Sequence, residues 1–242
     1  MIYITGDCHG SEIKFLENNM PGENTWTEDD KLIICGDFGF IWFDDEYPEG
    51  KAYFDGLLDF LESKSYDILF VDGNHENFNE LYKFPEVERY GNTVHKIRRN
   101  IFHLQRGRIY TIEGKTFFAF GGAYSIDKAS RFENISWWPQ ELPNEEEYRR
   151  GLEALKAVGN KVDYIVTHTA PDTALEYIKY SLAPQERNAL RLDHHDMLLR
   201  NYFDIIWHST EFKRWYFGHF HYDKHLTSKA RALLNDVEVI ED

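Results

Sequence analysis

The stretch Ile4-Thr5-Gly6-Asp7-Cys8-His9-Gly10 ends an apolar run that begins at Met1. The run predicts a short buried strand that stops at Gly6. Residues two apart in an extended chain point to the same side, so Asp7 and His9 can direct an oxygen and a nitrogen towards one point beyond the strand. These are typical metal ligands, although a single loop aspartate near a histidine is more often structural. The interpretation therefore depends on whether the chain repeats the pattern.

The pattern does recur, each time after an apolar run. Residues 31–35 predict a second strand, which Gly36-Asp37 follows, and residues 67–71 predict a third, which Asp72-Gly73-Asn74-His75-Glu76 follows. An apolar face over residues 51–63 predicts a helix between these two strands. Strands that alternate with helices indicate parallel βαβ units and an α/β fold, in which ligands gather beyond the carboxyl ends of the strands.

The middle of the chain has a different pattern. Four short apolar segments predict a local antiparallel section, with a hairpin turn at Glu113-Gly114-Lys115. These segments are residues 94–97, 101–104, 108–112 and 116–120. Residues 121–144 keep no period and are rich in aromatic and charged side chains, so they are predicted to form an active-site loop or flap.

The second half of the chain supplies more histidines at predicted strand ends. The strand over 162–167 ends at His168, and the strand over 213–217 ends at Gly218-His219-Phe220-His221. Helices are predicted over 145–158 and 185–202, a short helix over 12–19 after Ser11, and closing strands near Leu226 and over 237–240. No linker divides the chain, so residues 1–242 are predicted to form a single domain.

Composition limits the partners of the protein. The 242 residues carry a formal net charge of −15, which repels a duplex phosphate backbone and disfavours duplex nucleic acid as a partner. Two cysteines make no disulfide framework, and neither a signal peptide nor an apolar span of membrane length is present. These features predict a cytoplasmic protein without a membrane partner; the sequence does not indicate an oligomeric state.

The polar side chains at the predicted strand ends contain imidazole, carboxylate and amide groups. They are Asp7, His9, Asp37, Asn74, His168, His219 and His221, with His75 beside them. Nitrogen and oxygen ligands without thiolate suit Mn, Fe, Zn or Ni. Seven ligands exceed one tetrahedral site but fit two metals that share a carboxylate, and two metals about 3.5–4 Å apart form the clamp used for in-line displacement at phosphorus.

The sequence resembles the calcineurin-like metallophosphoesterases, whose signature is D-x-H, G-D, G-N-H-[DE], a lone H and G-H-x-H, each after a strand. All five blocks occur here in order: Gly6-Asp7-Cys8-His9-Gly10, Gly36-Asp37, Gly73-Asn74-His75-Glu76, Thr167-His168 and Gly218-His219-Phe220-His221. The resemblance covers nearly the whole chain. It implies a four-layer α/β/β/α sandwich, in which two mixed sheets are flanked by helices and the metals lie at the edge of the sheets.

The resemblance also implies two divalent metal ions, with Mn preferred and Fe, Zn or Ni as alternatives. Ligands of the first metal are Asp7, His9 and His221, and ligands of the second are Asn74, His168 and His219. Asp37 is the implied bridge between them and is therefore counted as catalytic.

Further residues are implied or expected to contact the substrate. His75 is similar to the histidine of the family that is not a metal ligand, which hydrogen-bonds the phosphate and protonates the leaving group. Asn74 is expected to contact the phosphate as well. The second block lacks the arginine that grips phosphate in the family's serine/threonine phosphatases, so Arg131 or Lys128 from the 121–144 loop is the candidate replacement.

The expected activity is metal-dependent hydrolysis of a phosphoester, by a water that two metals activate for in-line attack on phosphorus. The missing arginine and the acidic composition favour a small phosphorylated molecule, a nucleotide or a phosphodiester as substrate. A phosphoprotein phosphatase of the serine/threonine type is the alternative. A non-catalytic scaffold on the same fold is the third reading, and the intact ligand set opposes it.

Overall fold

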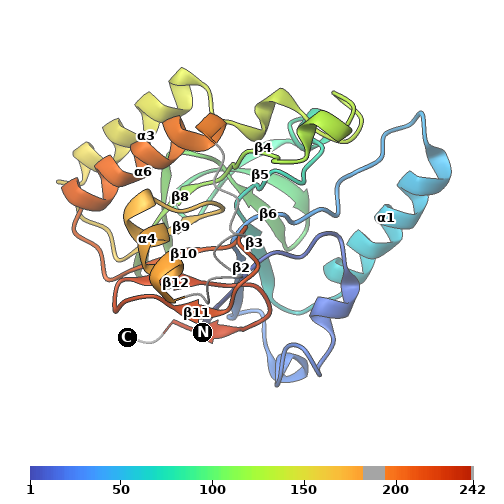
Figure 1. Cartoon of the computed structure of the whole chain (residues 1–242). Helices are drawn as coiled ribbons and strands as arrows, with labels where there is room; N and C mark the ends of the chain where they lie inside the picture. The colour runs from blue at the N-terminus through green and yellow to red at the C-terminus, as the bar shows by residue number, and fades with distance from the viewer. Residues whose placement is uncertain (182–193, 241–242) are drawn as a thin grey trace.

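The computed structural model describes residues 1–181 and 194–240 of the chain. Two mixed β-sheets pack face to face, and helices cover the outer face of each sheet (Figure 1). The predicted α/β fold class and the implied four-layer sandwich are thus confirmed.

The first sheet has the strand order β13-β1-β2-β3-β6-β5-β4. Its four central strands β1, β2, β3 and β6 are parallel, and β13, β5 and β4 are antiparallel to their neighbours. The strands are β1 (Ile2–Thr5), β2 (Lys31–Ile34), β3 (Asp67–Phe70), β4 (Glu86–Arg89), β5 (Asn92–Arg98), β6 (Ile101–Leu104) and β13 (Glu238–Val239).

The second sheet has the order β11-β12-β10-β9-β8-β7 and repeats this plan. Strands β12, β10, β9 and β8 are parallel, with an antiparallel strand at each end. The strands are β7 (Arg108–Ile112), β8 (Lys115–Phe120), β9 (Tyr164–Thr167), β10 (Arg214–Phe217), β11 (Lys224–His225) and β12 (Ala230–Ala232).

The prediction of one antiparallel section over residues 94–120 was wrong in its arrangement. The four segments are strands, but β5 and β6 belong to the first sheet and β7 and β8 to the second, and β6 runs parallel to β3. The predicted hairpin turn does join β7 to β8, with positive φ at both Glu113 and Gly114. Local pattern gave the strands, but only tertiary pairing could assign each hairpin to a sheet.

Helix α1 (Pro48–Glu62) covers the first sheet, and α3 (Glu145–Ala157), α4 (Asp172–Ser181) and α6 (Met197–Ser209) cover the second. The predicted helix over 51–63 begins earlier because Pro48 suits the first helical turn. The helix predicted over 145–158 is α3, and a capping box at Asn144 fixes its start.

Several local predictions need correction. Residues Glu12–Phe15 form a single 3-10 turn in place of a helix over 12–19, and the Ser11 side chain makes no cap hydrogen bond. Of the helix predicted over 185–202, residues 185–193 lie outside the described part of the chain, and α6 begins at Met197. Helices α2 (Phe78–Leu81) and α4 and strands β4 and β12 were not predicted. Strand β4 is a largely exposed edge strand without an apolar run, so periodicity could not reveal it.

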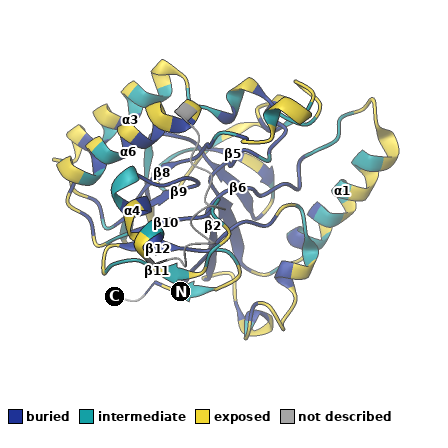
Figure 2. Cartoon of the chain, in the orientation of Figure 1, coloured by how far each residue is buried: buried dark blue, intermediate teal, exposed yellow. Residues whose placement is uncertain are grey.

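Three apolar clusters hold the layers together. Alternate residues of each central strand face opposite sides, so Ile4 and Leu69 pack between the sheets while Tyr3 and Phe70 pack on the helix-covered face of the first sheet. Strands β1, β2, β3, β6 and β9 are accordingly buried along their whole length (Figure 2). This packing fixes both sheets so that the carboxyl ends of β1, β2, β3, β9 and β10 lie near one another.

Among the described residues, no helix has the length and apolarity that crossing a bilayer requires.

Candidate metal centre

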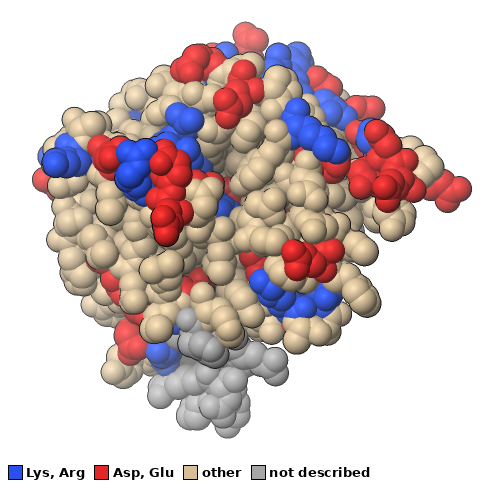
Figure 3. All heavy atoms as spheres, turned by 90° about the horizontal axis from the view of Figure 1, so that it is seen from above, with Lys and Arg blue, Asp and Glu red and all other residues tan. Residues whose placement is uncertain are grey.

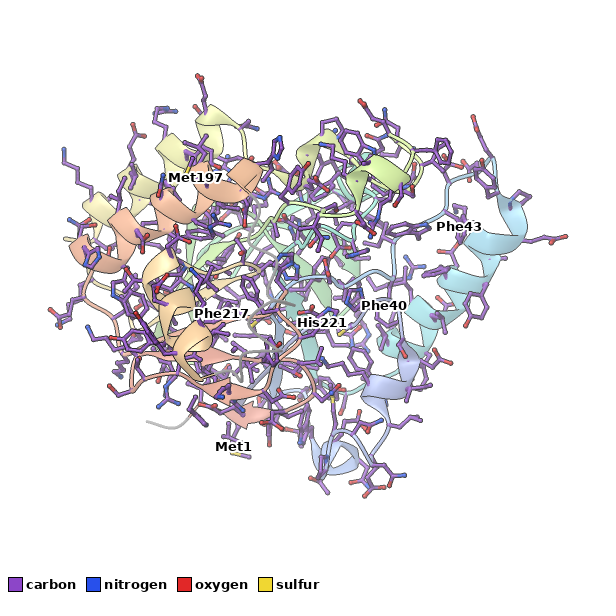
Figure 4. All side chains as sticks on the ribbon, in the orientation of Figure 1. Met1, Phe40, Phe43, Met197, Phe217 and His221 are labelled. Carbon is purple, nitrogen blue, oxygen red and sulfur yellow. The ribbon has the colours of Figure 1, made fainter. Side chains whose placement is uncertain are left out.

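Five loops that follow strands of both sheets bring the seven predicted ligands together. The first sheet supplies Asp7 and His9 after β1, Asp37 after β2 and Asn74 after β3, and the second sheet supplies His168 after β9 and His219 and His221 after β10. Figure 4 shows His221 between the two helix-covered flanks of the molecule. Residues as far apart along the chain as His9 and His221 have imidazole Nε2 atoms only 3.2 Å apart.

One group of donors consists of Asp7, His9 and His221. The Nε2 atom of His221 lies 3.2 Å from Oδ2 of Asp7, and Nε2 of His9 lies 3.7 Å from the same oxygen. One ligand atom from each residue lies within 4.8 Å of those of the other two, close enough to share one ion.

A second group lies beside it. The Nε2 atom of His168 is 3.2 Å from Oδ1 of Asn74 and 3.2 Å from Oδ1 of Asp37. The His219 ring packs edge-on against His168 with centroids 4.9 Å apart. Asp37 faces both groups, because its other oxygen, Oδ2, lies 3.6 Å from Nε2 of His9. A carboxylate with one oxygen towards each group can bridge two ions.

The donors fit divalent cations on three counts. Oδ2 of Asp7 is buried and accepts no hydrogen bond of suitable geometry, although Nε2 of His221 lies 3.2 Å away, and a bound cation would satisfy this oxygen. The Nδ1 atom of His168 lies 2.8 Å from the carbonyl oxygen of Cys35, and by donating to it leaves Nε2 free as a ligand atom. The nearly buried carboxylates of Asp7 and Asp37 place two negative charges in one site, which bound metal would offset.

The close approach of carboxylates and imidazoles in the site also shifts the pKa values of these groups. Burial alone would lower the pKa of His168, but the charges of Asp37 and Asp7 outweigh it and raise that pKa to about 10. Burial would raise the pKa of Asp37, yet contacts with His168 hold it well below its usual value. A metal that binds Nε2 of His168 must therefore displace a proton.

Backbone strain is concentrated at the ligands. His9, Asp37, His219 and His221 all have φ between 46° and 66°, in the left-handed region that non-glycine residues rarely adopt. Each such residue costs about 1–3 kcal/mol and persists only where the surroundings hold it. The Asp37 carbonyl provides part of that support, because it accepts hydrogen bonds from the amides of Cys8 and His9 at 3.0 and 2.7 Å.

Glycines before the ligands allow these loops to approach closely. A Cβ atom on Gly73 would lie 2.0 Å from Oδ1 of Asp37, and one on Gly218 would lie 2.1 Å from Oδ1 of Asp7. In both places the missing side chain leaves room for a ligand carboxylate from another loop.

We expect Gly73→Ala to weaken Mn²⁺ binding by about 10- to 100-fold, the cost typical of disturbing the groups that orient a ligand. The added methyl group would also lie 2.3 Å from the backbone nitrogen of Asp37, which cannot rotate away. Isothermal titration calorimetry on the metal-free protein measures the effect. Gly56→Ala is the control, because nothing lies within 4 Å of a Cβ atom at that exposed position in α1; equal affinity in the two variants would contradict the steric argument.

Glu76 supports the bridging loop, a role that the sequence motif did not indicate. Its buried carboxylate accepts hydrogen bonds from the amides of Phe38 and Gly39 at 2.7 and 3.1 Å. Burial, together with the charge of Asp37, raises its pKa to about 8. Glu76 thereby fixes the segment that follows Asp37.

His75 lies beside the two ligand groups. Its amide donates to Oδ1 of Asp37 at 2.8 Å, and its ring centroid is 5.0 Å from that of His9. Burial lowers the pKa of the ring, and the positive charge of Arg131 contributes to the shift. A protonated His75 would accordingly be a stronger acid than an ordinary histidine.

The structure separates the two candidate cations of the 121–144 loop. Arg131 lines the cavity, and its Nη1 and Nη2 atoms lie 3.3 and 3.2 Å from the ring nitrogens of His75. Lys128 points elsewhere: its Nζ atom lies 3.5 Å from the centre of the Trp137 ring and 3.8 Å from Oε1 of Glu141. Lys128 is not among the residues that line this cavity.

A cavity of about 340 Å³ opens over Asp37, Asn74 and His75. Sequence reasoning missed several of its other lining residues: Ile126, Asp127, Phe220 and Tyr222. For Asp127, the sequence does offer a signal: its four-residue spacing from Arg131 suits an ion pair between the two side chains. Trp42 and Trp138 pack edge-on with centroids 5.3 Å apart, and Trp138 is buried, so these rings pack on each other.

Ser125 was also missed. Its hydroxyl oxygen accepts a hydrogen bond from Nδ2 of Asn74 at 3.1 Å, which orients the amide oxygen of Asn74 towards His168. Ser125 belongs to the 121–144 loop, so this loop supports a ligand as well as lining the cavity.

Comparison with protein families gives one result for this chain. The family model of the calcineurin-like phosphoesterases matches residues 1–223, which include every residue of the centre described above. A search of curated proteins finds no match.

Proposed function

The chain belongs to the calcineurin-like phosphoesterase family, and from that premise we propose that it hydrolyses a small phosphorylated molecule, a nucleotide or a phosphodiester with two bound divalent metal ions. Mn²⁺ is the proposed metal, with Fe, Zn or Ni as alternatives that the same ligands accept.

The observation that carries the proposal is the position of Asp37. Its two oxygens face two separate groups of donors, 3.6 Å from His9 and 3.2 Å from His168. A lone structural metal would not require this arrangement. Two bound ions would activate a water for in-line attack and hold the phosphate oxygens.

The chain's own residues complete the proposed mechanism. Asp7, His9 and His221 would hold one ion and Asn74, His168 and His219 the other. His75, at the floor of the cavity, would hydrogen-bond the phosphate and give a proton to the leaving oxygen. The 121–144 loop would act as the flap, with Arg131 and Asn74 positioning the phosphate.

Two features support a small substrate over a phosphoprotein. In place of the phosphate-gripping arginine of the serine/threonine phosphatases, the second block has Phe40 and Ile41, which are buried in the core. The net charge is −15, and on the face seen in Figure 3 basic side chains stand in separate groups beside acidic ones. The described residues on this face form no extended basic track for a duplex.

Two unpaired cysteines, Cys8 and Cys35, favour a reducing compartment and hence the cytoplasm.

Metal removal tests the proposal. We expect chelator-treated protein to lose hydrolysis of chromogenic phosphoesters, and Mn²⁺ to restore it, because the water and the phosphate oxygens depend on the ions. A panel of cyclic nucleotides, single-stranded oligonucleotides and phosphopeptides, with Asp37→Asn as the inactive control, ranks the substrate classes. Metal-replete protein that is inert towards the whole panel would refute the proposal and favour a scaffold.

A further inference from the structure

Both terminal nitrogens of the Arg131 guanidinium have neighbours within the chain. Nη2 lies 2.8 Å from Oδ2 of Asp127 and 3.2 Å from Nε2 of His75. Nη1 donates to the carbonyl oxygen of Ser136 at 3.1 Å and lies 3.3 Å from Nδ1 of His75. Both terminal nitrogens therefore have two protein neighbours each, and a phosphate oxygen would have to compete with them.

The charge of Arg131 is also balanced at the cavity. Asp127 lines the same cavity and pairs directly with Arg131, whose side chain is 16% exposed, while that of Asp127 is 51% exposed. Apart from the candidate metal ligands and His75, the described residues of the cavity lining include one cation, Arg131, and one anion, Asp127, whose charges cancel. A phosphomonoester carries nearly two negative charges near neutral pH, whereas a phosphodiester carries one. Away from the proposed metal ions, Arg131 is the lining cation that could meet the extra charge of a monoester, and Asp127 already pairs with it.

The remaining wall suits a second organic group. Ile126, Phe220 and Tyr222 supply apolar parts of the cavity wall, and the ring of Phe220 packs edge-on against His219 with centroids 5.0 Å apart. A monoester has one ester group, which must point towards His75 to be protonated as it leaves. A diester has a second group, which can lie against this wall.

We propose that Asp127, through its ion pair with Arg131, makes this site selective for phosphodiester monoanions over phosphomonoester dianions. The proposal rests on the hydrolase function proposed above. Asp127 is thus a specificity-determining residue that acts through Arg131, and removal of its charge frees the guanidinium for the extra charge of a monoester.

The kinetic test uses two substrates with one leaving group: p-nitrophenyl phosphate, and its monomethyl diester. At about pH 8, above the second phosphate pKa of about 6, these are a dianion and a monoanion. We expect the wild-type protein with Mn²⁺ to have the higher kcat/KM for the diester. In Asp127→Asn, the monoester-to-diester ratio of kcat/KM should rise about five- to tenfold, as one unit of charge near the phosphate would produce.

A second arm shows whether Asp127 acts through Arg131. In an Arg131→Gln background, adding Asp127→Asn should change the ratio less than about twofold, because the two effects are coupled. Glu133→Gln removes the same charge from an exposed position in the same loop and should leave the ratio unchanged. An equal shift in Glu133→Gln, or an undiminished shift without Arg131, would overturn the assignment.

Binding provides a readout that does not need turnover. Calorimetry with inorganic phosphate should show tighter binding to Asp127→Asn than to wild type, while dimethyl phosphate should bind both alike. Hydrolysis of both esters with no change in ratio or in phosphate affinity would refute the role of Asp127 and leave the proposed function intact. The binding shift in a protein that hydrolyses neither ester would refute the hydrolase proposal instead.

Discussion

Asp37→Ala is expected to lower kcat/KM for any accepted phosphoester by about 10³–10⁵-fold, the equivalent of the several kcal/mol that metal ions contribute to such a transition state. The two oxygens of Asp37 face the two groups of donors, so its loss affects both metal sites. The same substitution should lower the metal content from about two ions per chain to one or fewer, as measured by elemental analysis of the purified protein.

Asp30→Ala is the matched control, because Asp30 lies at the opposite end of the same strand, β2. There Oδ1 of Asp30 accepts a hydrogen bond from the N-terminal amino group of Met1 at 2.7 Å, and Oδ2 accepts one from the amide of Thr27, also at 2.7 Å. Its removal should lower the unfolding free energy by about 0.5–2 kcal/mol, as loss of a cap does, and leave the metal content unchanged. An Asp37→Ala protein that keeps both ions and full activity would exclude the bridging role.

His75→Ala is expected to keep both metals and lose about 10²–10⁴-fold in kcat, the usual range for removal of a general acid. Metal retention follows from the backbone: the amide of residue 75, which holds Oδ1 of Asp37 at 2.8 Å, is unaffected by the change of side chain. A substrate with a good leaving group, such as a p-nitrophenyl ester, should be less affected than an alkyl ester, because it needs less protonation as it leaves. Rates on the two ester types measure this difference.

His225→Ala is the control for a histidine outside the site, since the His225 side chain is 61% exposed. Metal analysis is essential here, because a nitrogen of His75 also lies within 4.8 Å of ligand atoms of His9 and Asp37. Loss of one ion in His75→Ala would make His75 a ligand. Full activity with both ions bound would remove it from the mechanism.

The strands that could be predicted from the sequence are those whose burial gives them a run of apolar residues. Strands β1, β2, β3 and β9 are buried along their whole length, and each contains an apolar run of three residues. The edge strand β4 is largely exposed, and its mixed sequence Glu86-Val87-Glu88-Arg89 gives no such signal. The split of residues 94–120 between two sheets was equally hidden, because hairpins look alike whichever sheet they join.

The candidate site likewise has parts that could be predicted from the sequence and parts that could not. The seven candidate ligands could be named from short motifs after strands, because metal binding requires those residue types. The supporting contacts could not: Ser125 on Asn74, Glu76 on the loop after Asp37, and Asp127 on Arg131 join residues through space. Of these, only the last pair has a spacing that suggests contact.

The sequence alone thus determined the type of fold and the chemical nature of the metal ligands, because hydrophobic pattern and donor type are properties of short segments. Tertiary structure decided how the two sheets share the strands, which loop cation reaches the cavity, and how Asp127 balances it. These features depend on packing between distant segments: the left-handed backbone at His9 and Asp37 persists only because neighbouring loops hold it, and no local pattern encodes that support.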